Sequence, residues 1–291
     1  MLSKKKILFI VNPISGAKKK IPIEHLVQKH LNADLFKPEI SFTTSRGDAT
    51  ALSKQAVRDG FEIVVAVGGD GTINEVAQGL IGSSLSLAVI PRGSGNGFAN
   101  YFKIPHDPIE AIQVINKVQS RKIDTGTLNG KLFLSVAGLG FDARVSTAFD
   151  VFGKRGLISY MYISLREYFK FDPKEYRIEA DGLSIQTKAF LLTAANSTQY
   201  GNNAFIAPNA LIDDGLLDLV IIKPANTINS IFISLRLFQG TLNQSKYYEV
   251  YRVKEARIYH DDYEAQIDGE PIRVETETII KVLPSALNVI A

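Results

Sequence analysis

The stretch EIVVAVGGDGTINEVAQGL, residues Glu62–Leu80, joins an apolar run to a glycine-rich segment and a second apolar pattern. The unbroken run Ile63–Val67 is typical of a parallel strand that is buried on both faces. After the glycines, apolar side chains recur at the spacing of one helix face, at Ile73, Val76, Ala77 and Leu80. The stretch therefore predicts a strand, a tight turn and a helix in succession.

The turn Gly68–Thr72 combines three glycines with one carboxylate, that of Asp70. Glycines at a helix start let backbone N–H groups approach a phosphate, and the helix N-terminus adds positive potential. Asp70 would repel a bare phosphate, but Mg²⁺ bridges carboxylate and phosphate oxygens. No Gly-Lys-Ser/Thr follows, so the turn is not a Walker A loop. We interpret it as a nucleotide phosphate site that works with Mg²⁺.

The composition excludes several classes of protein. The chain has 291 residues, no cysteine, four scattered histidines and a net charge of +3. Disulfides and thiolate metal sites are therefore excluded, and the small charge argues against a nucleic-acid partner. The apolar run Ile7–Val11 is too short for a signal peptide or a transmembrane segment. We expect a cytoplasmic protein.

Strand-like and helix-like patterns alternate over residues 1–126. Apolar runs occur at Ile7–Val11, Glu39–Phe42, Ile63–Val67 and Leu87–Ile90, and helical patterns at residues 22–31, 48–58, 73–80 and 108–115, the last with Asp107 as its N-cap. Such alternation predicts an α/β domain with a parallel sheet. Ligands of such sheets bind outside the carboxyl ends of the strands. We therefore expect the loops that follow these strands to converge.

Residues 127–291 contain short β-like runs, with helical patterns only near 156–169 and 226–238. The runs include Gln186–Thr193, Thr278–Val282 and Leu287–Ile290, each of which we expect to form one strand. Many short strands predict an antiparallel β-sandwich. Gly138–Ala143 matches the dinucleotide pattern G-x-G-x-x-A, but we expect no helix after it and therefore reject NAD binding there.

Three further loops have both a structural and a functional interpretation. Asn12–Gly16 contains ordinary turn dipeptides, yet it follows the first strand. Pro91–Ala99 has three glycines, a hydroxyl and an arginine, which suit phosphate contacts, but it could equally be a flexible loop. Asp268-Gly269 between apolar runs is a strong hairpin signal. From the residues alone, a structural hairpin turn is the preferred interpretation over a functional role.

Together these segments resemble the diacylglycerol kinase catalytic-domain family, which includes bacterial lipid kinases and sphingosine kinases. The resemblance covers nearly the whole chain, with matching order and spacing at Asn12–Gly16, Thr43-Thr44 with Gly47-Asp48, Gly68–Glu75, Pro91–Ala99, Ala207–Ala210, Asp213–Gly215 and Asp268–Glu270. It implies an N-terminal α/β domain of NAD kinase/diacylglycerol kinase type that binds ATP, and a β-rich C-terminal sandwich domain that holds the lipid.

The resemblance also implies a role for individual residues. Contacts to ATP map to Asn12, Pro13, Ser15, Gly16, Thr44, Gly69, Asp70, Gly71, Thr72, Asn74, Glu75 and Ser94. Asp70 would reach the phosphates through Mg²⁺, and Asp268 and Glu270 would lie by the lipid hydroxyl, with Glu270 as proton acceptor. Either Glu270 or Asp70 could be the general base. A structural Mg²⁺ would be held by Asp214 and by the carbonyls of Leu211 and Leu216.

The implied activity is transfer of the ATP γ-phosphate to a lipid such as diacylglycerol. Gly97 replaces the aspartate that is usual in the bacterial branch, so a sphingosine or long-chain-base kinase is an alternative. In that case Asp142 would either bind the substrate amine or have a purely structural role. NAD kinase and a non-catalytic nucleotide or lipid sensor are the further alternatives. The lipid implies contact with a membrane surface, for which Phe149–Arg155 and Ile228–Phe238 are candidates. The oligomeric state is open, and a homodimer is one alternative because relatives often dimerise.

Overall fold

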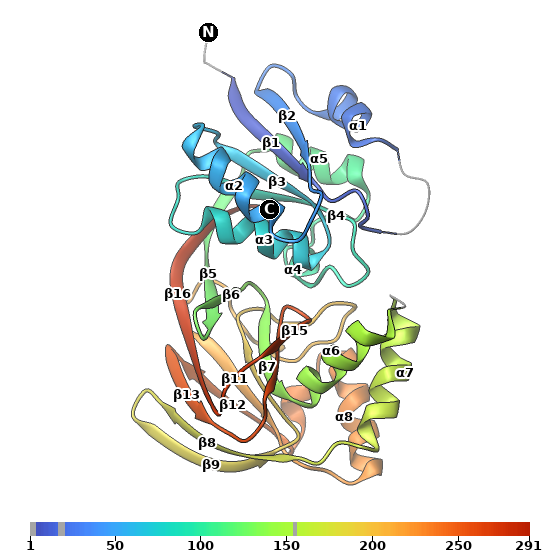
Figure 1. The fold of residues 1–291 in the computed structure, drawn as a ribbon, viewed down its shortest axis with the longest axis vertical. Helices are drawn as coiled ribbons and strands as arrows, with labels where there is room; N and C mark the ends of the chain where they lie inside the picture. The colour runs from blue at the N-terminus through green and yellow to red at the C-terminus, as the bar shows by residue number, and fades with distance from the viewer. Residues whose placement is uncertain (1–3, 17–20, 154–155) are drawn as a thin grey trace. The chain divides into compact units, whose positions relative to one another are not determined.

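The computed structural model describes residues 4–16, 21–153 and 156–291. The chain forms two compact units, of which unit 1 comprises residues 1–123 and 285–291, and unit 2 comprises residues 124–284 (Figure 1). Residues 285–291 therefore belong to unit 1, whereas a division at residue 126 assigns them to the C-terminal domain. The long strand β16 (Glu277–Ile290) begins in unit 2 and ends in unit 1.

Unit 1 is an α/β unit with a parallel sheet, which confirms the predicted fold class. Its sheet has the order β2-β1-β3-β4, and Asn288 and Val289 of β16 continue it beside β4. The strands are β1 (Lys5–Val11), β2 (Phe36–Phe42), β3 (Ile63–Gly68) and β4 (Ser86–Pro91). The helices are α1 (Ile23–His30), α2 (Asp48–Arg58), α3 (Asp70–Leu80), α4 (Gly97–Tyr101) and α5 (Pro108–Asn116).

The local sequence explains these elements. Every residue of β3 is buried, as expected for a central parallel strand with covered faces. The Asp107 carboxylate accepts hydrogen bonds from the N–H groups of Ile109 and Glu110, at 2.9 and 3.1 Å, so the predicted N-cap of α5 is confirmed. Helix α2 packs against α3, and α1 packs against α5.

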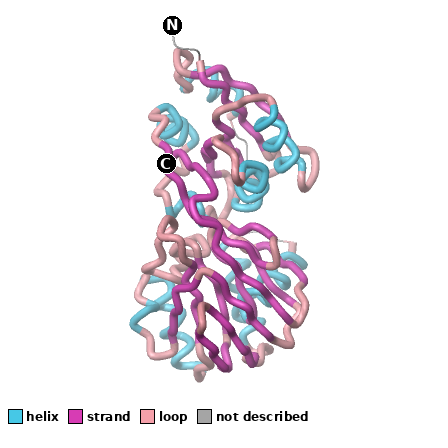
Figure 2. Tube along the Cα trace, turned by 90° about the vertical axis from the view of Figure 1, so that its left-hand side faces the viewer, coloured by secondary structure: helices cyan, strands magenta, loops and turns pink. Residues whose placement is uncertain are grey.

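Unit 2 is a sandwich of two antiparallel sheets. One sheet has the order β12-β11-β10-β7-β14-β15, and β16-β13-β8-β9 belong to the other (Figure 2). Between the sheets lies a core to which both contribute, including Leu139, Leu192 and Leu219 from the first and Ile178, Ile258 and Ile280 from the second. The strands are β5 (Ser120–Leu128, which starts in unit 1), β6 (Lys131–Phe133), β7 (Val136–Gly140), β8 (Lys174–Ala180), β9 (Leu183–Ala189), β10 (Leu191–Ala195), β11 (Leu217–Ile222), β12 (Tyr248–Val253), β13 (Glu255–Tyr259), β14 (Glu264–Ile267) and β15 (Glu270–Arg273).

Three helices lie beside the sheet that contains β7, β10 and β11. They are α6 (Phe141–Phe152), α7 (Leu157–Tyr168) and α8 (Thr227–Gln239). A second cluster of buried side chains, including Val136, Leu191 and Val220, lies on this side of the sheet, and Ile233 and Leu237 of α8 pack against it. A 3₁₀ turn, η1 (Leu242–Gln244), follows α8. Among the helices within residues 4–16, 21–153 and 156–291, none is long and apolar enough to cross a membrane.

The structure corrects three predictions for this half of the chain. Gln186–Thr193 is divided between β9 and β10, which belong to different sheets. The runs 278–282 and 287–290 are one strand, β16. A helix, α6, does follow the glycine pattern at 138–143, so the stated reason for rejecting NAD binding was wrong. Strand β7 nevertheless pairs antiparallel with both neighbours, which is not the βαβ setting of a dinucleotide site.

Candidate functional site

The loops predicted to converge do meet at the carboxyl edge of the unit 1 sheet. Asn12, directly after β1, donates its backbone N–H to the carbonyl of Val67 at 3.0 Å and its side-chain amide to the Thr72 hydroxyl at 3.2 Å. Arg92, directly after β4, donates its N–H to the Gly68 carbonyl at 2.7 Å. The expected convergence of the first three glycine-containing loops is therefore confirmed within unit 1.

Two glycines let the second and third loops touch backbone to backbone. A Cβ atom built on Gly93 would lie 2.7 Å from the Cα of Gly69 and 2.7 Å from Oδ1 of Asn96. Contacts this short leave no room for a side chain. The two loops therefore pack together with no side chain between them, next to the first turn of α3, where backbone N–H groups suit a phosphate.

We expect Gly93→Ala to weaken ATP binding about tenfold, because the added methyl group forces the two loops apart and shifts their N–H groups from a bound phosphate. Isothermal titration of ATP into the variant measures the effect, with the thermal midpoint recorded to separate lost affinity from unfolding. An unchanged ATP affinity in a folded variant would contradict a phosphate site between these loops.

The loop Pro91–Gly97 is held by its own amides. Asn96 accepts a hydrogen bond from the Gly93 N–H and donates one to the Gly93 carbonyl, both at 2.9 Å. Asn100 donates to the Gly95 carbonyl at 3.1 Å. Asn96 is buried and adopts a positive φ of 50°, which asparagine tolerates better than most residues. These bonds oppose the interpretation of this segment as a flexible loop.

Asp70 is the first residue of α3 and is half-buried at the point where these loops meet. Its Oδ1 accepts a hydrogen bond from the N–H of Phe98 in α4, at 3.3 Å. A carboxylate at a helix N-terminus is stabilised by the positive end of the helix. Oxygen ligands of this kind suit Mg²⁺. The residues present therefore fit a metal-bridged phosphate.

The fourth segment, Thr44–Asp48, reaches the same edge through Glu75 of α3. Glu75 accepts the N–H of Gly47 at 3.0 Å, and its backbone carbonyl accepts the hydroxyl of Thr50 at 2.8 Å. The Asp48 carboxylate accepts both the N–H and the hydroxyl of Thr44, at 2.7 and 2.6 Å. These bonds and those from Ser45 hold the pKa of Asp48 well below its usual range. In this structure Glu75 and Thr44 therefore shape the loop.

The structure places the remaining predicted ATP contacts along the same edge. Pro13, Gly16 and Ser94 are exposed, Ser15 donates its hydroxyl to the Asn12 carbonyl at 2.9 Å, and Gly71 is half-buried in the first turn of α3. Asn74 is buried and accepts a hydrogen bond from Gln78 within α3, at 2.7 Å. Among these residues Asn74 faces away from solvent, and the others leave backbone or side-chain groups accessible.

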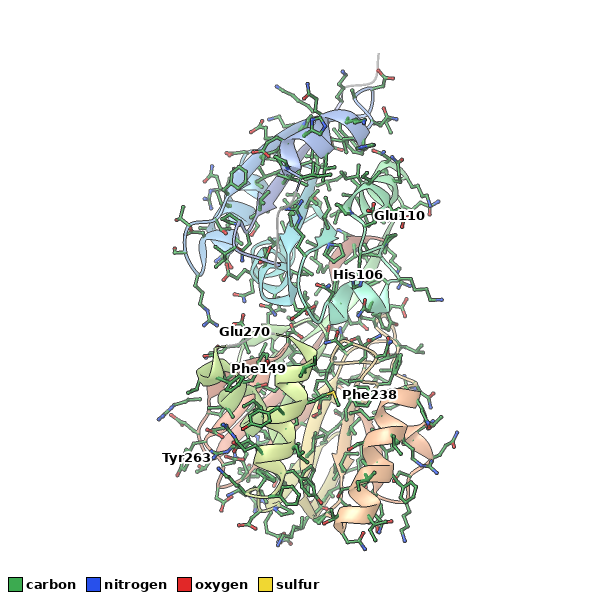
Figure 3. All side chains as sticks on the ribbon, turned by 90° about the vertical axis from the view of Figure 1, so that its right-hand side faces the viewer. His106, Glu110, Phe149, Phe238, Tyr263 and Glu270 are labelled. Atoms are coloured by element: carbon green, nitrogen blue, oxygen red, sulfur yellow. The ribbon has the colours of Figure 1, made fainter. Side chains whose placement is uncertain are left out.

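In unit 2 the Asp-Gly-Glu segment forms the predicted hairpin. Ile267 pairs with Glu270, and the two residues between them have positive φ values, 48° for Asp268 and 84° for Gly269, as in a type I′ turn. The Asp268 carboxylate accepts the N–H groups of Leu134, Ser135 and Val136 at 2.8–3.1 Å. It therefore fixes the turn to the segment before β7. Glu270 is exposed at the start of β15 (Figure 3).

The predicted structural metal site is also in unit 2. Asp214 accepts the N–H of Leu216 at 3.0 Å and forms an ion pair with Arg252. Asp124, which is buried, accepts the N–H of Gly215 at 2.6 Å. Within the described parts of the chain, no group of three or more His, Cys, Asp or Glu side chains has metal-binding geometry. A cation held by Asp214 here would therefore need backbone carbonyls as its other protein ligands.

Sequence reasoning missed Asn96 and Gln266. Asn96 precedes a helix of only five residues, which is too short to produce a periodic pattern, although an asparagine among glycines is a signal for a positive φ. Gln266 is a buried polar residue inside β14. That strand has only four residues, so the alternation of polar and apolar side chains does not show which of them are buried. Its contacts appear only once β7, β10 and β14 are paired.

Comparisons with known proteins agree with this architecture. The diacylglycerol kinase catalytic domain family matches residues 6–128, and the YegS C-terminal NAD kinase beta sandwich-like domain family matches residues 135–291. The chain is 34% identical over 246 residues to a diacylglycerol kinase of Bacillus subtilis, covering 81% of this chain and 80% of that protein. It is 31% identical over 258 residues to a Klebsiella pneumoniae protein named "Probable lipid kinase YegS-like", covering 86% and 84%.

The fold has a solved counterpart. A crystal structure of a diacylglycerol kinase from Bacillus anthracis superposes with a TM-score of 0.75 at 23% identity, covering 98% of this chain and 96% of that one. The two domain matches, the sequence relatives and the fold lead to one assignment. The chain belongs to the family of lipid kinases that carry a diacylglycerol kinase catalytic domain.

Proposed function

We propose that this lipid kinase transfers the γ-phosphate of Mg-ATP to a hydroxyl group of a membrane lipid such as diacylglycerol. The observation that supports this most is the edge of unit 1 where Gly69 and Gly93 approach each other beside Asp70 at the start of α3. Bare backbone, a helix N-terminus and one carboxylate are what an Mg²⁺-bound phosphate chain needs.

In this proposal the loops of unit 1 bind and orient the nucleotide. The N–H groups at the start of α3 and in the Pro91–Gly97 loop contact phosphate oxygens, and the Asn96 bonds keep that loop in place. Asp70 holds Mg²⁺, which neutralises charge on the phosphates. Phosphoryl transfer has a loose transition state, so positioning and charge neutralisation supply most of the rate.

Unit 2 contributes the carboxylate that takes the proton of the lipid hydroxyl. We assign this role to Glu270, with Asp70 as the competing candidate. Asp268, with its carboxylate on three backbone N–H groups, positions the turn that carries Glu270. A general base of this kind typically contributes about 10²–10⁴-fold to the rate.

Transfer of labelled γ-phosphate from Mg-ATP to lipids in mixed micelles tests the function. The panel contains diacylglycerol, sphingosine, ceramide, monoacylglycerol and phosphatidylglycerol, with NAD as a soluble acceptor. We expect label in diacylglycerol. Label in sphingosine would move the assignment to a long-chain-base kinase, which the glycine at position 97 would then explain. Label in NAD alone, or ATP binding without any transfer, would overturn the proposal.

We also propose that Asp214 and the carbonyls of Leu211 and Leu216 hold a structural Mg²⁺. Asp214 and Leu216 already form one tight turn, and a cation there would compete with Arg252 for the carboxylate. We expect Mg²⁺ to raise the thermal midpoint of the wild type and not that of Asp214→Asn, because binding to the folded state alone stabilises it. Equal shifts in the two proteins would rule out this site, and Asp213→Asn is the matched control.

Contact with the membrane is assigned to exposed apolar faces of α7 and α8. On α7 these side chains are Ile158, Met161, Tyr162 and Leu165, with Phe169 just beyond its end, and on α8 they are Ile228, Ile231, Phe232, Leu235 and Phe238. Tyr168 of α7 donates to Ser230 of α8 at 3.0 Å, so the two helices lie together. Of the candidate segment Phe149–Arg155, residues 154–155 lie outside the described part of the chain.

The charges on these two helices fit an anionic lipid surface. Arg166 and Arg236 are their basic residues, and the acidic residue Glu167 is buried and paired with Arg144 and Arg166. Because Arg166 and Glu167 cancel on α7, the two helices together have a net charge of +1, which comes from Arg236 on α8. Cations that flank an apolar helix face favour an anionic bilayer.

We expect Phe232→Gln combined with Leu235→Gln to reduce binding to phosphatidylglycerol vesicles by about 10-fold or more, because each side chain contributes about 1.5–3 kcal/mol when fully buried in an apolar phase. Vesicle co-sedimentation measures the bound fraction. Val250→Gln, which changes an exposed apolar residue on β12, is the control. Unchanged vesicle binding, or a change in oligomeric state in its place, would contradict membrane contact through these helices.

A further inference from the structure

Unit 2 contains a buried polar cluster that the proposed reaction does not use. At its centre is Asp142, the second residue of α6, which is 5% exposed. Its Oδ2 accepts hydrogen bonds from the Thr193 hydroxyl at 2.9 Å, the Tyr200 hydroxyl at 3.0 Å and the Gln266 side-chain amide at 3.1 Å. Its Oδ1 accepts the N–H of Ala143 at 2.8 Å. One carboxylate therefore collects four donors.

The sheet is built to receive this carboxylate. Thr193 on β10, Gly138 on β7 and Gln266 on β14 are register partners on three neighbouring strands. A Cβ atom on Gly138 would lie 2.0 Å from Oδ2 of Asp142, so glycine leaves the space that the carboxylate occupies. Gly140 has a φ of 88°, which L side chains rarely adopt, and there the chain turns from β7 into α6. This turn places the Asp142 carboxylate against Gly138 of β7, the strand that precedes the helix.

Gln266 connects this cluster to the hairpin turn. Its amide nitrogen donates to Asp142, and its amide oxygen accepts the N–H of Gly269 at 2.8 Å. A side-chain amide can donate to a carboxylate from its nitrogen and accept a backbone N–H at its oxygen, whereas an ionised carboxylate can only accept. A glutamate at this position would place a second negative charge beside Asp142. Because Gln266 is 1% exposed, water does not replace either bond.

The turn is therefore held from two sides. On one side the Asp268 carboxylate binds the backbone of Leu134–Val136, and on the other the Gly269 N–H binds Gln266. Glu270 follows directly and starts β15. Two independent anchors on a two-residue turn fix where the next side chain begins, which is what a catalytic group needs from its supporting residues.

We propose that Asp142 and Gln266 are positioning residues that hold the turn bearing Glu270, so that Asp142 acts on the reaction through Gln266 and Gly269 without contacting substrate. This inference rests on the proposed role of Glu270 as the general base. Asp142 is buried, and in this proposal it takes no proton from the substrate.

The protonation of Asp142 gives the proposal a second measurable consequence. Burial raises the pKa of its carboxyl group to about 6, against the opposing effect of its hydrogen-bond donors. Burial raises the pKa values of Tyr160 of α7, Tyr176 of β8 and Tyr200, and the negative charge of Asp142 adds to the effect on each of these tyrosines. Protonation turns one oxygen of Asp142 into a donor, so the carboxyl group can no longer accept all four hydrogen bonds, and we expect the bond from Gln266 to weaken. Activity should therefore fall as the pH drops through about 6.

Gln266→Leu tests the proposal, because leucine removes both bonds with little change in volume. We expect kcat for lipid phosphorylation to fall about 10–100-fold, as misplacement of a catalytic group by about 1 Å can cost 10²-fold. ATP affinity, measured by titration, should stay at the wild-type value. Thr278→Val is the matched control, since it removes a buried side-chain bond, to His260, elsewhere in unit 2.

A double variant separates positioning from simple loss of stability. If Gln266 acts through Glu270, then Gln266→Leu should slow the wild type and leave Glu270→Gln no slower than before. Asp142→Asn should remove the decrease of activity near pH 6. Additive losses in the double variant, or an equal loss of kcat in Thr278→Val, would overturn the proposal. If the turnover of Glu270→Gln alone equals that of the wild type, Glu270 is not the general base. That result would disprove the proposed function of Glu270 and is distinct from a failure of the positioning proposal.

Discussion

Asp70→Asn is expected to reduce lipid phosphorylation about 10³-fold or more, because it removes the carboxylate that we propose to hold Mg²⁺, and loss of the cation that neutralises charge on a transferring phosphoryl group costs this much in comparable sites. The asparagine keeps the shape of the side chain, and its carbonyl oxygen can still accept the Phe98 N–H. The fold and the start of α3 should therefore survive. What is lost is the negative charge that we propose to hold Mg²⁺.

The measurement is initial rate against Mg²⁺ concentration at saturating ATP and lipid. Excess Mg²⁺ should restore little activity, since a neutral amide is a poor ligand for this ion. Asp107→Asn is the control, because it makes the same chemical change in the same unit at an N-cap, where asparagine is as effective as aspartate. Turnover of Asp70→Asn within tenfold of the wild type would contradict the metal role.

Glu270→Gln is expected to reduce kcat about 10²–10⁴-fold, the usual contribution of a positioned general base. The variant keeps the size of the side chain and loses its ability to accept a proton. Since Glu270 belongs to unit 2 and the proposed ATP contacts belong to unit 1, ATP affinity should be unchanged. Single-turnover rates combined with ATP titration measure the two quantities separately.

Glu275→Gln serves as the control for this prediction, because it neutralises another exposed glutamate of unit 2, a few residues after β15. Full turnover of Glu270→Gln would exclude Glu270 as the base and leave Asp70 as the candidate. A loss of ATP binding together with turnover would show that Glu270 acts on the nucleotide, which would also contradict the assignment.

Several elements were predictable because their signals lie in a few neighbouring residues. The run Ile63–Val67 predicted a buried strand because all its side chains must be covered, and β3 is buried throughout. Asp107 followed by proline predicted the start of α5, since the capping bond spans only two or three residues. Asp268-Gly269 predicted the β14–β15 hairpin, because that dipeptide accepts two positive φ angles.

Which of these elements pair with one another could not be predicted from local patterns. The run Gln186–Thr193 looks continuous, but β9 and β10 pair in different sheets, and sheet pairing depends on partners far away in the chain. Helix α6 was missed because two glycines and a buried aspartate weaken its start, and Asp142 is stabilised there by Thr193, Tyr200 and Gln266. These hydrogen-bond donors lie far from Asp142 in the sequence, so local helix propensity does not include their effect.

The candidate site shows the same division. The glycines and Asp70 were identifiable because their residue types alone suit phosphate and Mg²⁺. That Asp268 binds three backbone N–H groups, and that Gln266 ties Asp142 to the turn before Glu270, depends on contacts across more than 120 positions of sequence. Hydrogen bonds between buried groups form only when folding brings donor and acceptor within about 3 Å, so only the tertiary structure could reveal what supports the carboxylate that we propose as the general base.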